Sequence, residues 1–199
     1  SQVSGGIVMI IFNILILSLE GNVGVAAYGV IANISIVVTA LYTGLAQGMQ
    51  PLISTYYGLN HKDHIRKIMN YGQFTMILLS VVMYAVLFVF ASQVTGIFNS
   101  EGNTVLQKIA EVGLKLYFTS NIFVGFNTIT ATFFTSIEKA LPAHILSLLR
   151  GLVLIIPLAF VMSALWGMNG IWLCFPVTEA VTAILGFFIY FKMIKTFSA

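Results

Sequence analysis

The sequence predicts an all-α integral membrane protein, a polytopic bundle of six transmembrane helices. Hydrophobic residues make up 59% of its 199 residues and charged residues 8%, whereas soluble domains average about 25% charged residues. A soluble fold of this length has too little interior to bury so much apolar surface. The apolar runs are long and continuous, without the alternation of a membrane β-barrel, and helices satisfy their own backbone hydrogen bonds in lipid.

Six apolar segments follow one another along the chain. A spanning helix needs roughly 20 residues, and every segment except the first, residues 7–19, reaches that length. Turn-forming stretches separate them, among them EGN at 20–22, NSEGN at 99–103 and WGMNG at 166–170. Because the chain opens at Ser1 without an initiator Met or a basic leader, we expect a fragment that begins inside a transmembrane helix. The expected helices lie near residues 3–19, 23–57, 64–98, 104–137, 140–165 and 169–195.

Basic residues collect on one side of the membrane if these helices alternate in direction. The opposite side holds only Lys108 and Lys115. Cytoplasmic loops concentrate Lys and Arg, so we expect the basic side and the C-terminus to face the cytoplasm of a cell membrane. The same rule accounts for the run NHKDHIRK, so we expect no nucleic-acid binding, and no further ligand near its two histidines indicates a metal site. The basic side holds Lys62, Arg66, Lys67, Lys139, Lys192 and Lys195.

The stretch GLAQGMQPLISTYYG, residues 44–58, ends the second segment with amides and a proline. Gly44 and Gly48 are four residues apart, which permits close helix contact. Gln47 and Gln50 lie one turn apart and need polar partners or water. Two interpretations stay open: a well-packed helix end with interfacial tyrosines, or amides that face a cleft or gate.

Several stretches resemble the multidrug and toxic compound extrusion (MATE) family. They are GNVGVAAYGVIANI at 21–34, the block just described with the basic loop after it, and LLRGLVLIIPLAFVMSALWGMNGIWLCFPVTEAVTAIL at 148–185. The resemblance is most specific at Gln-Gly-x-Gln-Pro and at Gly-x-x-Gly-x-Trp. It implies twelve helices in two lobes, with this chain as the C-terminal lobe and the N-terminal lobe as its missing partner. It also implies proton- or sodium-coupled antiport of amphipathic, often cationic compounds, without a cofactor.

Amides and aromatic residues within the segments are candidates for a substrate cleft. Flat cationic compounds suit aromatic faces and a few amides, although a lipid-facing phenylalanine surface has a similar composition. Some MATE members carry cation-linked acids on the seventh and tenth helices, and the corresponding segments here contain none. The coupling site therefore stays unassigned. The cleft candidates are Asn13, Asn33, Gln47, Gln50, Asn121, Phe123 and Asn127.

Two charged residues lie deep inside apolar segments, Arg150 in the fifth and Glu179 in the sixth. Intramembrane charges are functional candidates by default. Counted from the basic side at 1.5 Å per residue, their depths are roughly 13 and 18 Å, a difference that an arginine side chain can cover. We expect an ion pair between neighbouring helices, with proton carriage by Glu179 as the competing interpretation.

Pro157 and Pro176 interrupt the same two segments. Each lacks the amide hydrogen that a helix interior needs. Measured from the turn at 166–170, their depths are roughly 12 and 9 Å, so they are candidates for a shared hinge, or for static kinks that shape packing.

Two other functions were compared with drug antiport. A related flippase for lipid-linked saccharides would be expected to carry more basic charge in its cleft than Arg150 alone. A membrane enzyme subunit is the second alternative, but no His-Glu zinc motif, acidic metal cluster or Ser/Lys dyad appears in the segments. We therefore expect no enzymatic activity.

Overall fold

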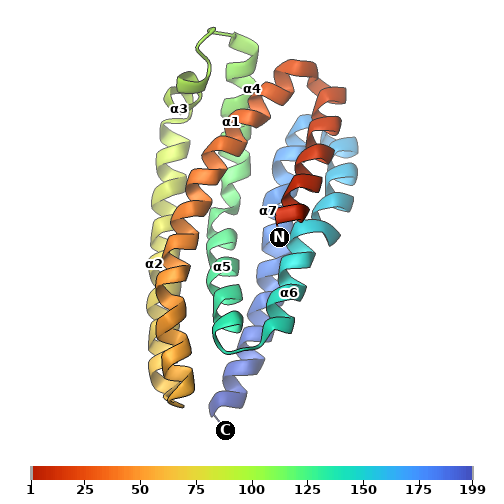
Figure 1. Cartoon of the computed structure of the whole chain (residues 1–199). Coiled ribbons are helices and arrows are strands. Elements are labelled where there is room, and N and C mark those ends of the chain that lie inside the picture. Colours follow the sequence, from red (N-terminus) through yellow and green to blue (C-terminus); the bar gives the residue numbers. More distant parts are fainter. Residues whose placement is uncertain (1, 199) are drawn as a thin grey trace.

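A computed structural model describes residues 2–198, and the side chains of residues 4–193. This part of the chain forms helices and short turns without a strand, packed as a bundle of long helices (Figure 1). The elements are α1 (Gln2–Gly58), α2 (Lys62–Val89), α3 (Ala91–Phe98), α4 (Thr104–Tyr117), the 3₁₀ turn η1 (Phe118–Ser120), α5 (Asn121–Ser136), α6 (Ala140–Leu148), the π turn η2 (Leu149–Val153) and α7 (Ile155–Ser198).

Two of these helices fold back on themselves at a glycine. α1 reverses at Gly21, with φ of 63°, and α7 reverses at Gly167, with φ of 56°. Glycine adopts positive φ without the steric cost that other residues meet. Figure 1 shows both reversals at the same end of the bundle. The described residues therefore form six legs: 2–20, 22–58, 62–98, 104–136, 140–166 and 168–198.

Besides the fifth leg, which contains the π turn η2, two legs that the sequence predicts as single helices are interrupted. The third leg breaks at Phe90 between α2 and α3. The fourth tightens into the 3₁₀ turn η1, where the hydroxyls of Thr119 and Ser120 each donate to a carbonyl three residues earlier, at 2.7 Å. Such side-chain bonds compete with the regular helical ladder. Hydropathy does not indicate where such hydrogen bonds form, so the sequence predicts both legs as continuous helices.

The Gly-x-x-Gly-x-Trp stretch builds the second reversal. Gly167 supplies the positive φ. Three residues later, a Cβ on Gly170 would collide with the backbone carbonyl of Met162, so only glycine lets the two legs approach this closely. Trp172 is then buried against Gly113, whose Cβ would lie 2.7 Å from the indole ring. The stretch is thus a packing motif of the fold.

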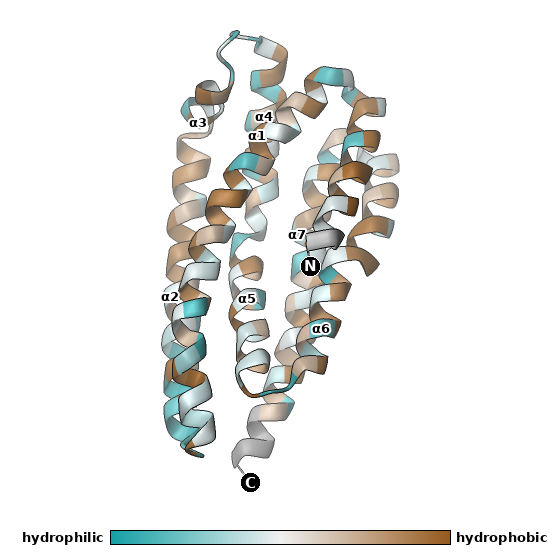
Figure 2. Cartoon of the chain, in the orientation of Figure 1, coloured by the Kyte–Doolittle hydropathy of each residue, from teal (hydrophilic) through white to brown (hydrophobic). Residues whose placement is uncertain are grey.

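The outer surface of the bundle is strongly apolar. Ile97, Phe74 and Phe188 are 78%, 68% and 67% exposed, and Figure 2 shows apolar residues along the middle of the helices with hydrophilic residues concentrated at the ends. Apolar surface of this extent marks contact with lipid or another protein. Helices 4–58, 62–89 and 140–193 are long and apolar enough to cross a membrane, so the chain is a membrane helical bundle.

Charged residues separate toward the two ends of the bundle. The turns at 59–61 and 137–139 and the last turns of α7 share one end, here called the basic end, which holds Lys62, Lys139 and Lys192. The reversals at Gly21 and Gly167 and the loop 99–103 share the other end, here called the turn end (Figure 1). The predicted neighbour Lys195 has a side chain outside the described residues.

Candidate functional site

The two charges that the sequence places inside the membrane meet in the structure. Arg150 Nε lies 2.9 Å from Glu179 Oε1. Glu179, on the last leg of α7, is 1% exposed, whereas the Arg150 side chain is 27% exposed. Because the guanidinium carries five N–H donors and one of them holds the carboxylate, Arg150 has further donors for other groups.

The π turn η2 presents Arg150. Leu154 N donates to Leu149 O, five residues back, at 2.9 Å, which widens the helix by one residue. Pro157 explains why the regular ladder stops there: it cannot donate to the carbonyl of Val153, and its ring crowds that carbonyl. π turns inside helices occur frequently at functional sites.

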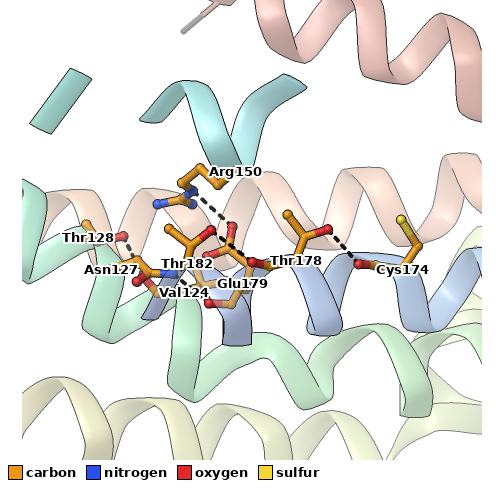
Figure 3. A network of polar contacts seen from close by, with 8 residues as sticks. All are labelled: Val124, Asn127, Thr128, Arg150, Cys174, Thr178, Glu179 and Thr182. Carbon is orange, nitrogen blue, oxygen red and sulfur yellow. Dashed lines mark hydrogen bonds and ion pairs between the residues drawn. The ribbon is translucent and has the colours of Figure 1, made fainter. Parts of the chain in front are cut away.

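Asn127 completes the environment of Glu179. Its Nδ2 donates to Glu179 Oε2 at 2.8 Å and to the Glu179 backbone carbonyl at 3.0 Å (Figure 3). Both carboxylate oxygens therefore accept a hydrogen bond. A buried charge is tolerated when it is paired and hydrogen-bonded in this way. The Oδ1 atom of Asn127 is buried without a hydrogen-bond partner among the described residues.

The two helices that carry Asn127 and Glu179 also carry threonines close to the ion pair. Thr128 donates to Val124 O, Thr178 to Cys174 O and Thr182 to Thr178 O, at 2.7 to 2.9 Å (Figure 3). Each hydroxyl donates its hydrogen bond within its own helix, and its oxygen can still accept a bond from another donor. The surroundings of Glu179 are therefore rich in acceptor oxygens.

A cavity of about 500 Å³ opens beside the ion pair. Five legs contribute to its wall, and Arg150 lies on it. Its aromatic side includes Tyr117 and Phe175, which stack with ring centroids 4.5 Å apart. The hydroxyl-bearing residues on the wall are Ser4, Tyr28, Thr39, Thr43, Tyr117, Thr128 and Ser147.

The structure does not gather the predicted cleft residues in one place. Asn127 lies at the ion pair. Asn121 is buried elsewhere on α5, where its backbone carbonyl accepts from Ser80. Asn33 bonds to Gly29 O of its own helix, and Asn13 is half-buried on the first leg. The remaining candidates, Gln47, Gln50 and Phe123, are exposed.

The phenylalanines of the fourth leg have mixed roles. Phe118, Phe133 and Phe134 are buried in the core, whereas Phe123 is 37% exposed. The sequence predicts either a substrate cleft or a lipid-facing surface for these phenylalanines, and neither includes packing in the core. Which phenylalanines are buried depends on how the helix is rotated about its axis, and composition does not determine that rotation.

Apart from Arg150, none of the residues that line the cavity is among the predicted site residues. Thr39 and Thr43 stand four residues apart on α1, and Tyr117 and Thr128 lie on α4 and α5. The four-residue spacing of Thr39 and Thr43 was the available signal, since it places two hydroxyls on one helix face.

The proposed hinge residues occupy different surroundings. Pro157 lies in the first turn of α7, shortly after the π turn ends at Val153. Pro176 lies inside α7, which departs from helical geometry at Gly167. In the described part of the chain, no three His, Cys, Asp or Glu side chains come together as a metal site.

Several multidrug export proteins are similar to this chain in sequence. It is 27% identical over 188 residues to a multidrug export protein MepA of Staphylococcus saprophyticus, covering 94% of this chain and 41% of that protein. It is 25% identical over 179 residues to the protein of the same name in Staphylococcus haemolyticus, covering 90% and 39%. The chain thus spans about two fifths of the length of these relatives.

Solved structures share the fold. One is an inward-facing conformation of a multidrug resistance MATE family transporter of the MOP superfamily, with a TM-score of 0.93 and 22% identity over 99% of this chain and 46% of that one. An outward-facing conformation gives 0.91 and 21% over 99% and 44%. The family model MatE matches residues 3–161. The match covers most of the sequence, and the chain belongs to the MatE family.

Proposed function

We propose that the chain is one lobe of a secondary active transporter that exports amphipathic, often cationic compounds. The observation that carries this proposal is a buried acid, Glu179, held by Arg150 at the wall of a cavity inside a membrane bundle. The multidrug export proteins that the chain matches supply the substrate class. A second lobe, absent from this chain, completes the transporter.

Glu179 is our candidate for ion coupling. The sequence contains six acidic residues, and Glu179 is the one in the middle of an apolar leg. In one state its carboxylate is paired with Arg150. In the other it binds a proton or a sodium ion, and Arg150 turns toward the cavity, where its exposed part already lies. A switch of this kind changes the polarity of the cavity wall when the ion binds.

The transporter works in a defined orientation. We propose that the basic end and the C-terminus face the cytoplasm of a cell membrane, because Lys and Arg concentrate there. Cysteines at positions 62 and 195 should then react with an impermeant reagent from the same side, and a cysteine at 101 from the other. Reaction of positions 62 and 195 from opposite sides would contradict the arrangement.

Export and coupling are tested in proteoliposomes that contain the complete protein. Ethidium, a fluorescent amphipathic cation, should accumulate when a proton or sodium gradient is imposed, and an ionophore for the driving ion should abolish accumulation. Glu179→Gln should bind ethidium but no longer respond to the gradient, because the amide accepts hydrogen bonds without exchanging a proton. Glu111→Gln, which alters an acid near the turn end, is the matched control.

The outcomes separate the two parts of the proposal. Ethidium transport that depends on neither the proton nor the sodium gradient would contradict antiport. Wild-type accumulation by Glu179→Gln would remove Glu179 from coupling while leaving export in place. Among the described residues that line the cavity, Arg150 is the basic one and Glu179 compensates its charge, so drug export is favoured over a flippase for anionic saccharide carriers.

A further inference from the structure

A second cleft, of about 960 Å³, lies at the basic end and plays no part in the ion pair. Three elements bring three lysines to it: Lys62 begins α2, Lys139 precedes α6, and Lys192 lies near the end of α7. Ile189 and Met193 give the cleft an apolar wall. None of the described residues that line it is acidic.

Two helices also begin beside this cleft, since Lys62 and Lys139 both line it. The N-cap residues of α2 and α6 are His61 and Lys139, and neither side chain makes a capping hydrogen bond. The first N–H groups of a helix lack acceptors within the helix, and the helix dipole places partial positive charge there. Helix N-termini bind phosphate for this reason. The lysines and the two helix ends therefore favour the same ligand charge.

The turns that lead into the cleft are well ordered by backbone bonds. Asn60 N donates to Tyr57 O at 3.0 Å, and His61 N donates to Tyr56 O at 2.9 Å. Lys139 N donates to Phe134 O at 2.9 Å. These bonds fix where α2 and α6 begin, so the cleft is a built feature of the fold rather than an accident of side-chain placement.

Neighbouring charges leave the region basic. Asp63 and Glu138 are exposed beside Lys62 and Lys139, and neither lines the cleft. Arg66 and Lys67 follow on α2, also exposed. The tendency of cytoplasmic loops to be basic explains why these charges share one side, but not why three of them converge on one cleft with an apolar wall.

The apolar wall continues toward the middle of the bundle. Leu185, Ile189 and Met193 are spaced four residues apart on α7, which aligns them in one stripe. Leu185 is 40% exposed. A ligand with an anionic head at the lysines would therefore find apolar surface below it, at the depth where acyl chains lie.

We propose that this cleft binds the phosphate headgroup of an anionic phospholipid, with an acyl chain along the stripe of Leu185, Ile189 and Met193. Basic pockets between transmembrane helices on the cytoplasmic side bind such headgroups. Tyr57, half-buried on the cleft wall, lies where interfacial tyrosines contact headgroups. The site shares no lining residue with the cavity beside the ion pair, and the proposal is independent of which compound is exported.

The experiment measures lipid binding to the purified complete protein. Thermal unfolding is followed in detergent with added phosphatidylglycerol, with phosphatidylcholine, or with inorganic phosphate. Phosphatidylglycerol should raise the melting temperature more than phosphatidylcholine does, and inorganic phosphate should have little effect because it lacks the acyl chain. Equal protection by inorganic phosphate would overturn the lipid assignment and leave a free-anion site.

Matched variants locate the effect. Lys62→Gln/Lys139→Gln/Lys192→Gln removes the three cleft lysines, and Arg66→Gln/Lys67→Gln/Lys108→Gln removes the same charge from positions that do not line the cleft. Each cleft lysine should account for roughly a fivefold change in affinity for phosphatidylglycerol. The control triple should retain most of the binding. Equal losses in both triples would reduce the site to diffuse electrostatic attraction and overturn the proposal.

The leucine at the apolar wall gives a further check that does not change charge. Leu185→Ser should weaken phosphatidylglycerol binding while leaving binding of a short-chain analogue unchanged. If both lipids lose equally, the acyl chain does not follow α7.

Discussion

Two legs of the bundle carry polar residues at membrane depth, and they treat them in opposite ways. On the last leg of α7, Thr178, Glu179 and Thr182 are at most 1% exposed and bonded within the lobe. On the second leg of α1, four polar residues are exposed and share one face: Thr39, Thr43, Gln47 and Gln50.

The difference shows what each face must contact. A polar group in hydrocarbon without a partner is costly, so the buried set supplies its own partners. The exposed set on α1 needs water, substrate or another lobe. The polar residues of α7 therefore hold parts of this lobe together, whereas the α1 face is open to contact from outside the lobe.

Breaking the ion pair should give the largest effect. Arg150→Met leaves Glu179 buried without its cation, and losing one partner of a buried pair costs about 3–5 kcal/mol. Chemical denaturation of the purified protein measures the loss. Arg150→Met/Glu179→Met should recover most of it, because apolar replacement of both partners is often neutral. Equal stability of Arg150→Met and wild type would show that the pair is not needed for stability.

Removing the amide that holds Glu179 should have a smaller effect. Asn127→Ala leaves Oε2 of the carboxylate without a donor, which costs about 1–3 kcal/mol. Denaturation again provides the readout, with Asn33→Ala, an amide bonded only to its own helix, as the control. An equal loss in the two variants would contradict a special role for Asn127.

The α1 face should behave in the reverse manner. Gln47→Ala/Gln50→Ala should change stability by no more than about 0.5 kcal/mol, as exposed substitutions usually do. Ethidium export should nevertheless fall at unchanged expression. Gln93→Ala, an exposed glutamine on α3, is the matched control. Wild-type export by the double variant would favour the other interpretation, in which both glutamines only pack at the helix end.

The prolines test whether the α7 region also bends during transport. Pro157→Ala/Pro176→Ala should slow export a few-fold without loss of folding, since each proline loosens the helix around it. Stopped-flow efflux gives the rate. An unchanged rate in this variant, with folding intact, would mean that the irregularity before Pro157 is static.

Hydropathy and turn chemistry predict the class of the fold well. The helical membrane bundle is confirmed, and the EGN and WGMNG stretches fall at the two reversals, where glycine adopts a positive φ without steric cost. Counting residues also predicts that Arg150 and Glu179 lie near each other, and Arg150 Nε lies 2.9 Å from Glu179 Oε1. What counting cannot supply is helix rotation, so the sequence predicts Asn127 as a cleft residue and does not predict its bond to Glu179.

The π turn and the cavity could not be predicted from the sequence, for a related reason. η2 depends on how Pro157 disturbs a carbonyl one turn earlier, and a proline in a sequence does not say which way the chain adapts. The cavity needs residues from five legs at once. Long-range packing of this kind is not contained in any single segment.

The reversals at Gly21 and Gly167 also bear on biosynthesis. Each joins two legs with almost no connecting residues, so each pair can enter the bilayer as a single hairpin rather than as two independent spans. The loop 99–103 is different, since residues 100–102 are exposed and Asn103 caps the helix that follows. An epitope inserted after Gly102 should therefore leave assembly intact. The same insertion at Gly167 should impair assembly, because it separates the two legs of one hairpin.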